Sequence, residues 1–429
     1  MTYTHLLNDL DLLPESRSLD PDAAPQAGGD STQTVQIVRA SVLAQVPEVT
    51  TQLMRSFAST AALRDAQGGT PKAQRDELRV SGLLALSIPQ ALGGLGASWS
   101  EVLRVVRQLS RVDSSVAHLF AFHHLMLATV QLFGHHAQWQ PWLALSARHD
   151  WFWGNALNPL DQRATWRAID GGVEISGRKS FCSGAADSEM LIVSAYPEGA
   201  AGAFLVAAVP TGRSGIQIFN DWNNIGQRQT DSGSVHFERL RVDDGERLCD
   251  PGPLSTPRAC LRPLIAQAIL VNIYVGIAEG AFEDARQYTV NEARPWPPSG
   301  QSRVVEDPHV RVSFGEFQVG LAAMRALADQ AGAALDAALA RGDALTEAER
   351  GELAITIATA KVAATRTGLD ICNRLFEVTG ARSTHASLGL DRHWRNLRTH
   401  TLHDPLASKL EQLGEWVLEG RYPVPSFYS

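Results

Sequence analysis

Two histidines near the end of the chain have the residue type and spacing for proton chemistry. His400 and His403 lie three residues apart in RTHTLHDP, so they share one face if this segment is helical. Imidazole titrates near neutral pH, and it can therefore both donate and accept a proton at a reactive oxygen. We predict that both histidines are catalytic and that His123 converges on them from an earlier segment.

Other interpretations of the histidines stay open at this point. His400, His403 and Asp404 together have the residue types of a facial metal triad. We predict no metal there, because Pro405 directly follows the aspartate and restricts the backbone. Hydrogen bonding within a core is the ordinary role of a buried histidine, and we assign it to three others, His118, His385 and His393.

A cluster of small polar residues in the middle of the chain could bind a phosphate or ribityl hydroxyls. QRQTDSGS, residues 227–234, offers hydroxyl and backbone N–H donors around a glycine. An ordinary polar turn has the same composition. The cluster consists of Arg228, Thr230, Asp231, Ser232 and Ser234.

Three further residues could contact a flat ligand. Ser183 has a hydroxyl in KSFCSGA, and it could equally be a turn residue before Gly184. Asn155 offers an amide donor. Trp222 offers a flat aromatic surface, which could instead fill the core.

The periodicity of apolar residues divides the chain into segments that must position these side chains. Residues 35–150 and 258–429 repeat apolar positions every three or four residues, which predicts an N-terminal helical domain and a C-terminal four-helix bundle. Residues 151–257 contain short apolar or alternating runs between glycine-rich turns, typical of a central antiparallel β sandwich or barrel. We predict a flexible tail over residues 1–34, with a short helix around residues 6–13.

The composition excludes several classes of protein. The chain has 429 residues and a formal net charge of −8, so neither a nucleic acid nor an anionic membrane is an expected partner. Its four cysteines have no CxxC spacing, which excludes a zinc ribbon and a disulfide scaffold. No apolar run approaches the roughly 18 residues that span a bilayer, and the N-terminus lacks a secretory signal. We therefore predict a cytoplasmic protein.

Several motifs resemble one family in the same order along the chain. ARSTHASLGLDRHWRNLRTHTLHDPLASK, residues 381–409, is similar to the C-terminal signature of dibenzothiophene monooxygenase and related flavin-dependent sulfur-acquisition monooxygenases. The other matches are HLFAFHH at 118–124, KSFCSGA at 179–185, NIGQRQTDSGSV at 224–235 and NEARPW at 291–296. The order of helices, β domain and helical bundle resembles the acyl-CoA dehydrogenase fold, so the resemblance implies an α+β fold of that kind.

The resemblance implies a flavin site and no metal. It implies reduced FMN, in preference to FAD, supplied by a separate NADH-dependent flavin reductase. It implies that Ser183 helps to hold a flavin hydroperoxide and that the flavin contacts come from Asn155, Ser183, Trp222, Arg228, Thr230 and Ser232. Arg294 is implied to reach the flavin phosphate across a subunit interface, where a neighbouring cofactor tail would meet Glu377, Gly380, Ala381 and Arg382. A homo-oligomer, and specifically a tetramer, follows from the same resemblance.

The implied reaction is oxygenation of an organosulfur compound by O2 and reduced FMN, from a sulfide or thiophene to a sulfoxide and a sulfone. Dibenzothiophene-like heterocycles are the first expectation. Phe122 stands where the heterocycle oxidiser has a tyrosine, so smaller sulfur compounds stay open. The alternatives are an N-hydroxylating monooxygenase of the same fold and an acyl-CoA dehydrogenase or oxidase. The loop RTHTLHD has no glutamate like the one that removes an α-proton in acyl-CoA dehydrogenases, which disfavours the last.

Overall fold

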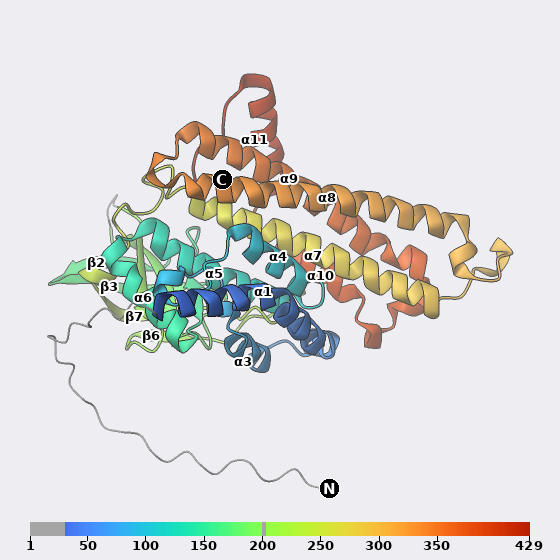
Figure 1. Ribbon diagram of the computed structural model, residues 1–429, viewed down its shortest axis with the longest axis horizontal. Coiled ribbons are helices and arrows are strands. Elements are labelled where there is room, and N and C mark those ends of the chain that lie inside the picture. The colour runs from blue at the N-terminus through green and yellow to red at the C-terminus, as the bar shows by residue number, and fades with distance from the viewer. Residues whose placement is uncertain (1–30, 200–202) are drawn as a thin grey trace, which may run out of the picture. The chain divides into compact units, whose positions relative to one another are not determined.

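The computed structural model describes residues 31–199 and 203–429 and has an α+β architecture (Figure 1). The chain divides into two compact units, Met1–Val42 and Leu43–Ser429, and the description below concerns the second. The helix predicted around residues 6–13 lies outside the described residues. Helix α1 (Ser31–Ala58) includes residues 31–34, which we had assigned to the tail. This boundary differs because polar residues in a first helical turn give no apolar periodicity.

Five helices follow α1 and precede the sheet: α2 (Ala61–Gln67), α3 (Lys72–Val80), α4 (Trp99–Ser110), α5 (Ser114–Phe133) and α6 (His136–His149). Ser98 and Glu101 form a capping box at the start of α4, which satisfies backbone groups that the helix itself cannot pair. Asp113 caps α5 by accepting hydrogen bonds from the N–H groups of the first turn. The Asp113 cap fixes the start of α5, which is the helix that contributes to the site.

Seven strands form one sheet: β1 (Trp153–Ala156), β2 (Thr165–Ile169), β3 (Gly172–Lys179), β4 (Met190–Pro197), β5 (Leu205–Pro210), β6 (Ile216–Ile218) and β7 (Val235–Asp243). The order is β1-β4-β2-β3-β7-β6, and β5 pairs with β4. Most pairs are antiparallel, as predicted, but β1 and β2 each run parallel to β4. The prediction of a purely antiparallel domain is wrong at these two pairs, because alternation marks a strand without specifying its partner.

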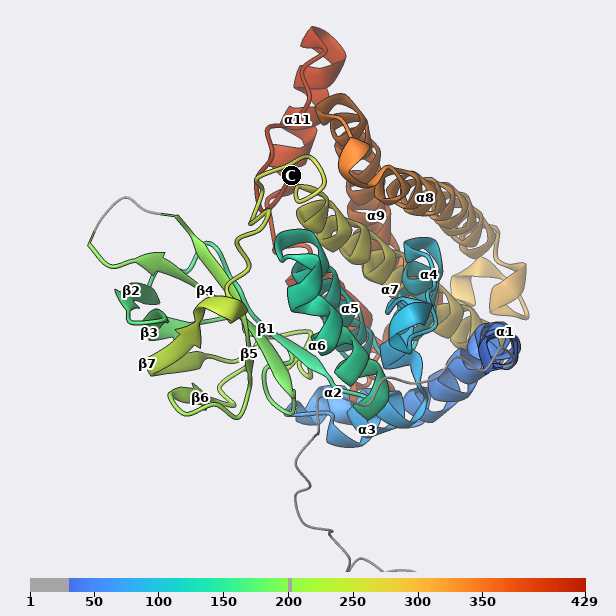
Figure 2. The same ribbon diagram turned by 60° about the vertical axis from the view of Figure 1, so that its left-hand side comes forward.

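Three long helices form the C-terminal region: α7 (Leu261–Asn291), α8 (Pro308–Ala340) and α9 (Glu347–Thr379). They run side by side, and α4 packs against α7 and α8 (Figure 2). The shorter helix α10 (Asp391–His400) packs on α7 and α9, and α11 (Leu406–Glu419) packs on α9. Of the two histidines predicted to be catalytic in this segment, His400 is the last residue of α10 and His403 lies in the turn between α10 and α11.

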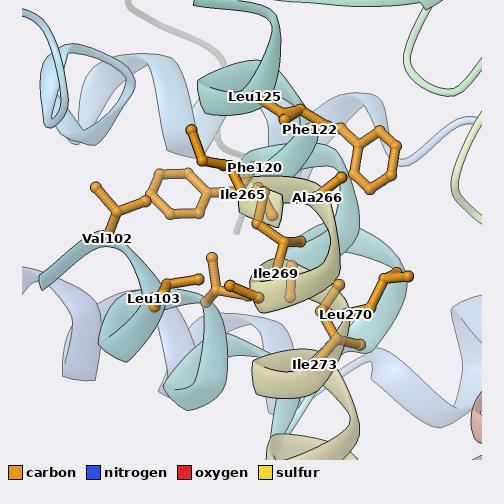
Figure 3. Close-up of a cluster of buried hydrophobic side chains, with 14 of the residues drawn as sticks. Val102, Leu103, Phe120, Phe122, Leu125, Ile265, Ala266, Ile269, Leu270 and Ile273 are labelled. Atoms are coloured by element: carbon orange, nitrogen blue, oxygen red, sulfur yellow. The ribbon is translucent and has the colours of Figure 1, made fainter. Parts of the chain in front are cut away.

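The main hydrophobic core lies between the first helices and α7. Figure 3 shows side chains of α4, α5 and α7 packed together, among them Val102, Phe120 and Ile269. A second core fills the sheet domain and includes Val193, Val209 and Phe237. Burial of these side chains is the main favourable contribution to folding and makes the helices a rigid support for the site.

Two helices meet a test of length and apolar composition for a membrane span, α5 and α7. The expectation that no apolar run approaches this length is therefore wrong. Almost all residues in the apolar window of each helix are buried inside the protein, so these helices have the character of core helices.

Candidate active site

A cavity of about 580 Å³ lies where α5, the loops of the sheet and the end of α10 meet. Its volume is in the range usual for small-molecule sites. Aromatic side chains, hydroxyls, amides and imidazoles surround it. The lining residues are His118, Phe122, Asn155, Phe181, Ser183, Trp222, Asn223, Asn224, Ile225, Gln227, Thr230, Ser232, Arg398, Thr399, His400, Leu402 and His403.

Two of the cavity histidines form a buried pair. Nδ1 of His118 and Nε2 of His400 lie 3.0 Å apart and share a hydrogen bond. Burial and the nearby His403 lower the pKa of His118 to about 3. Burial, His118 and His403 also hold the pKa of His400 well below its ordinary value. Both rings are therefore neutral near pH 7, and one ring donates to the other.

Of His118 and His123, the structure places only His118 in the cavity lining. His123 is fully buried, and both its ring nitrogens are used, because Nε2 donates to the Leu84 carbonyl and Nδ1 accepts from the Trp153 N–H. It does not line the cavity, so its predicted convergence on His400 and His403 is wrong. His118 is buried and hydrogen-bonded, as predicted for a core histidine, and it also lines the cavity.

Helical periodicity explains this difference. His118 and His123 are five residues apart, a spacing that turns the second side chain away from the face of the first. His118 and Phe122 are four residues apart, share a face of α5 and stack with ring centroids 3.9 Å apart. This spacing was the signal in the sequence that could have identified His118.

His403 lies in the turn after α10 and lines the cavity with a side chain that is 35% exposed. Its Nδ1 is 3.1 Å from Oδ1 of Asp404. The aspartate does not line the cavity, because its carboxylate is buried against Lys361 of α9. Among the described residues, no group of three His, Cys, Asp or Glu side chains could hold a metal ion.

The two remaining histidines that we assigned to a core differ from each other. His393 is buried and its Nε2 lies 2.7 Å from the Asp284 carboxylate, which confirms the prediction. His385 is exposed and pairs with the Ser387 hydroxyl, so its predicted core role is wrong. It lies in a short surface turn rather than on the inward face of a helix.

The hydroxyls predicted to hold a ligand form a continuous chain along one side of the cavity. Ser183 Oγ and Ser232 Oγ are 2.7 Å apart, and Ser232 Oγ is 2.7 Å from Thr230 Oγ1. Thr230 Oγ1 donates to the Gln227 carbonyl. Hydroxyl hydrogens can rotate, so the chain can offer either donors or acceptors to a ligand.

Helices α2 and α3 hold the loop that carries these hydroxyls. Arg75 of α3 lies 3.0 Å from Asp231, and Thr70 donates to the same carboxylate over 2.7 Å. Arg64 of α2 donates to Gln229 over 2.7 Å. Asp231 is thus an anchor for the loop rather than a lining residue.

Arg228 and Ser234 also lie outside the cavity lining. The Arg228 guanidinium donates to the backbone carbonyls of Asp65 and Asn224, and the Ser234 hydroxyl donates to Asp221. The structure therefore places neither side chain against the cavity. The residue types predicted a donor cluster, but only tertiary contacts decide which donors are already used.

Asn155 and Trp222 both line the cavity, as predicted for contacts with a flat ligand. Asn155 Oδ1 accepts from the Leu157 N–H. Trp222 Nε1 donates to the Gln227 carbonyl over 2.7 Å, which fixes the indole, and its ring meets Phe181 edge-on. The cavity therefore has an oriented aromatic wall.

The residues predicted to meet a cofactor across a subunit interface lie outside the cavity lining of this chain. Arg294 is exposed, and so is Glu377, which pairs with Arg374. The same is true of Gly380, Ala381 and Arg382. Their predicted roles concern a neighbouring subunit and stay predictions.

Several buried polar atoms of the cavity residues lack hydrogen-bond partners within the described part of the chain. They are His118 Nε2, His400 Nδ1, Gln227 Oε1 and Thr399 Oγ1. Unpaired buried polar groups are costly, and a ligand with hydrogen-bonding edges would reduce that cost. Together with the aromatic wall, this arrangement fits a flat heteroaromatic molecule.

The sequence matches three family models in succession: Acyl-CoA dehydrogenase, N-terminal domain, over residues 45–150; Acyl-CoA dehydrogenase, middle domain, over residues 157–240; and Acyl-CoA dehydrogenase, C-terminal domain, over residues 268–407. These matches confirm the predicted fold class.

Individual relatives define the family more closely. A Pseudomonas putida protein named "Probable FMNH2-dependent monooxygenase SfnC" is 64% identical over 88% of this chain and 96% of its own length. The structure of methanesulfinate monooxygenase MsuC from Pseudomonas fluorescens has a TM-score of 0.88 at 63% identity and covers 89% of this chain and 99% of its own. FMN-bound TdsC of Paenibacillus sp. A11-2, a dibenzothiophene monooxygenase, has a TM-score of 0.85 at 39% identity with the same coverage. The chain therefore belongs to the FMNH2-dependent monooxygenases of the acyl-CoA dehydrogenase fold, the family that includes dibenzothiophene monooxygenase.

Proposed function

We propose that this chain oxygenates a small organosulfur anion of the alkanesulfinate class, using O2 and reduced FMN from a separate NADH-dependent flavin reductase. The strong identity to MsuC, whose name states a methanesulfinate substrate, supports this class over dibenzothiophene. The observation that carries the proposal is the charge of the cavity lining, which contains Arg398 and no carboxylate.

Arg398 is available to bind an anion. It belongs to α10, lines the cavity and has no side-chain hydrogen bond or ion pair with any other residue that the structure describes. A guanidinium is always charged and matches the two oxygens of a sulfinate with paired donors. An amine, the substrate class of an N-hydroxylase, would be a cation near pH 7 and would be repelled by this side chain.

The cavity residues fit FMN as the cofactor. Trp222 and Phe181 would contact the ring, and the hydroxyl chain and Asn155 would meet its polar edges. When bound, reduced flavin supplies two electrons and activates O2, so that one oxygen atom reaches the substrate and the other leaves as water. A sulfinate sulfur has a lone pair, and this pair would form the bond to the added oxygen, which converts the sulfinate to a sulfonate.

The chain's own residues then have separate tasks. The buried pair of His118 and His400 offers neutral hydrogen-bond donors and acceptors without adding charge. His403 also lines the cavity, is more exposed than the buried pair, and is the imidazole to which we assign the acceptance and return of a proton. Phe122 and Leu402 supply apolar surface that limits water in the cavity.

The cavity lining provides no catalytic base for the alternative reaction, that of an acyl-CoA dehydrogenase. Removal of a substrate α-proton needs a carboxylate in the cavity, and none lines it. Asp404, which is close in sequence, is buried and bound to Lys361.

The oligomer and the cellular location are part of this proposal. We infer a cytoplasmic homotetramer, in which the exposed Arg294, Glu377 and Arg382 serve the cofactor site of a neighbouring subunit. A mass of about four times 46.5 kDa by light scattering is the expected result. A monomer with full FMN affinity would contradict the tetramer.

The function is tested by product analysis with purified protein, a flavin reductase, NADH, FMN and air. Methanesulfinate, dibenzothiophene, a small sulfide, an amine and an acyl-CoA serve as the substrate panel. We expect sulfinate to gain one oxygen faster than any other member of the panel reacts. Preferred oxidation of dibenzothiophene would refute the proposed substrate class, and desaturation of the acyl-CoA would refute the reaction.

A further inference from the structure

A buried carboxylate lies directly behind one of the cavity histidines. Asp404 accepts a hydrogen bond from Nδ1 of His403 over 3.1 Å. Its side chain is only 6% exposed and does not line the cavity, whereas His403 does. The carboxylate therefore reaches the cavity by hydrogen bonding through the imidazole of His403.

Residues from three helices hold this carboxylate. Lys361 of α9 donates to Asp404 Oδ1 and also to Gln267 of α7, whose amide is 3.5 Å from the same carboxylate oxygen. Lys409 of α11 lies 4.0 Å from Oδ2. The other titratable groups that interact with the carboxylate are Tyr274, His400 and Tyr428. A carboxylate held from several sides has little freedom to turn away from His403.

The charge state of Asp404 decides which nitrogen of His403 carries hydrogen. Burial would raise the pKa of the carboxyl group, but the hydrogen bond from His403 and the charge of Lys361 hold that pKa well below its usual range. An ionised carboxylate can only accept hydrogen bonds. The hydrogen must therefore be on Nδ1 of His403, which leaves Nε2 for the cavity.

This arrangement distinguishes His403 from the other two cavity histidines. His118 and His400 bond to each other and have no carboxylate partner among the described residues. A neutral pair can orient a bound group, but an imidazole backed by a carboxylate can also accept a proton and stabilise the charge that results.

We propose that Asp404 is a positioning residue, which fixes the hydrogen of His403 on Nδ1 and presents Nε2 to the cavity as its proton acceptor, while Lys361 holds the carboxylate in place. The inference rests on the proposed function only where it assigns this proton transfer to the oxygenation of the substrate. The tautomer itself can be measured without turnover.

The first test is nitrogen NMR of the full chain with 15N-labelled histidine, loaded with FMN. His403→Gln serves to assign the signal. We expect the native His403 to carry its hydrogen on Nδ1. A neutral His403 with its hydrogen on Nε2 would overturn the proposal, and this measurement does not depend on the folding of an Asp404 variant.

The second test compares Asp404→Asn with Asp284→Asn. Asp284 of α7 gives a matched control, because it binds His393 of α10, the helix before the His403 turn, but lies outside the cavity lining. We expect Asp404→Asn to lower oxygenated product per NADH by about 10- to 100-fold, with the lost electrons recovered as hydrogen peroxide. FMN affinity should stay unchanged, and Asp284→Asn should keep the native product yield.

The outcomes separate this inference from the proposed function. Equal loss of product yield in both variants would mean that the carboxylate only stabilises the fold, which would overturn the positioning role. If the native protein oxygenates no sulfur compound but His403 has the expected tautomer, the positioning role stands and the proposed function fails.

Discussion

At the level of single residues, Arg398 is the group through which the cavity can distinguish an anionic substrate from a neutral one. A hydrogen bond to a charged group contributes about 1.5–3 kcal/mol, so Arg398→Gln should raise KM for methanesulfinate about 10- to 100-fold. Arg398→Lys should recover part of this loss, because it keeps the charge without the paired donors. Steady-state kinetics of the three proteins provide the measurement.

The same variants show whether the Arg398 side chain binds the substrate or the cofactor. If Arg398→Gln weakens FMN binding in a titration and leaves KM for the sulfinate unchanged, the side chain binds the flavin phosphate instead. Oxidation of a neutral sulfide is the internal control, since its rate should not depend on this charge.

Residue types and spacing predicted much of the site, including His400, His403, Ser183, Asn155 and Trp222 as neighbours of one cavity. They did not predict which polar side chains already form hydrogen bonds within the fold and are therefore not available to a ligand. The clearest case is the donor cluster of residues 227–234, in which some side chains face the cavity and others anchor the loop. The distinction depends on helices α2 and α3, which are more than 140 residues away in sequence, and no local pattern contains it.

At the level of elements, helix α3 supports the site without lining it. Arg75 of α3 is fully buried, pairs with Asp231 and donates to the carbonyls of Ala186 and Asp187 beside the Ser183 loop. Arg75→Met would leave Asp231 buried without this partner, and such changes cost about 3–5 kcal/mol. We expect a lower free energy of unfolding by urea denaturation and weaker FMN binding, because two cavity loops lose their common anchor.

Arg79 on the same helix is the matched control. It pairs with Asp187 and Glu189 but is partly exposed, so Arg79→Met should cost about 1 kcal/mol or less. If the two substitutions lowered stability and FMN affinity equally, burial of the Arg75 pair would not be the cause.

The sequence predicted the strands better than their arrangement. Short apolar or alternating runs marked β4, β5 and β7 at the observed places. The parallel pairing of β1 with β4 joins segments more than 30 residues apart, with the β2–β3 hairpin between them. Which strands pair follows from how the helices and the sheet pack together, and this information is not present in any one segment.

At the level of the whole molecule, buried neutral histidines predict sensitivity to mild acid. Burial lowers the pKa of His118 to about 3 and that of His123 to about 4, and it holds the pKa values of His124 and His400 well below normal. Below about pH 6.5 the unfolded chain binds protons that the folded protein does not, so stability must fall as the pH falls.

The expected loss between pH 7.5 and 5.5 is about 1 kcal/mol for each of these histidines, measured by urea unfolding at both pH values. The carboxylates Asp284 and Asp404 have lowered pKa values and lose their stabilising contribution only at more acidic pH, so they do not mask the effect. A flat stability profile across this range would mean that the histidines take up protons in the folded state.

The packing of α5 against α7 also has a consequence for how the chain folds during synthesis. Helix α5 is apolar on almost every face, and part of the surface that covers it comes from α7, which begins at Leu261, more than 120 residues after α5 ends. A growing chain must therefore leave α5 partly uncovered while the whole sheet domain is made. We expect nascent chains that stop before α7 to bind chaperones or aggregate, and ribosome-release experiments with chains ending near residues 255 and 300 would show the transition.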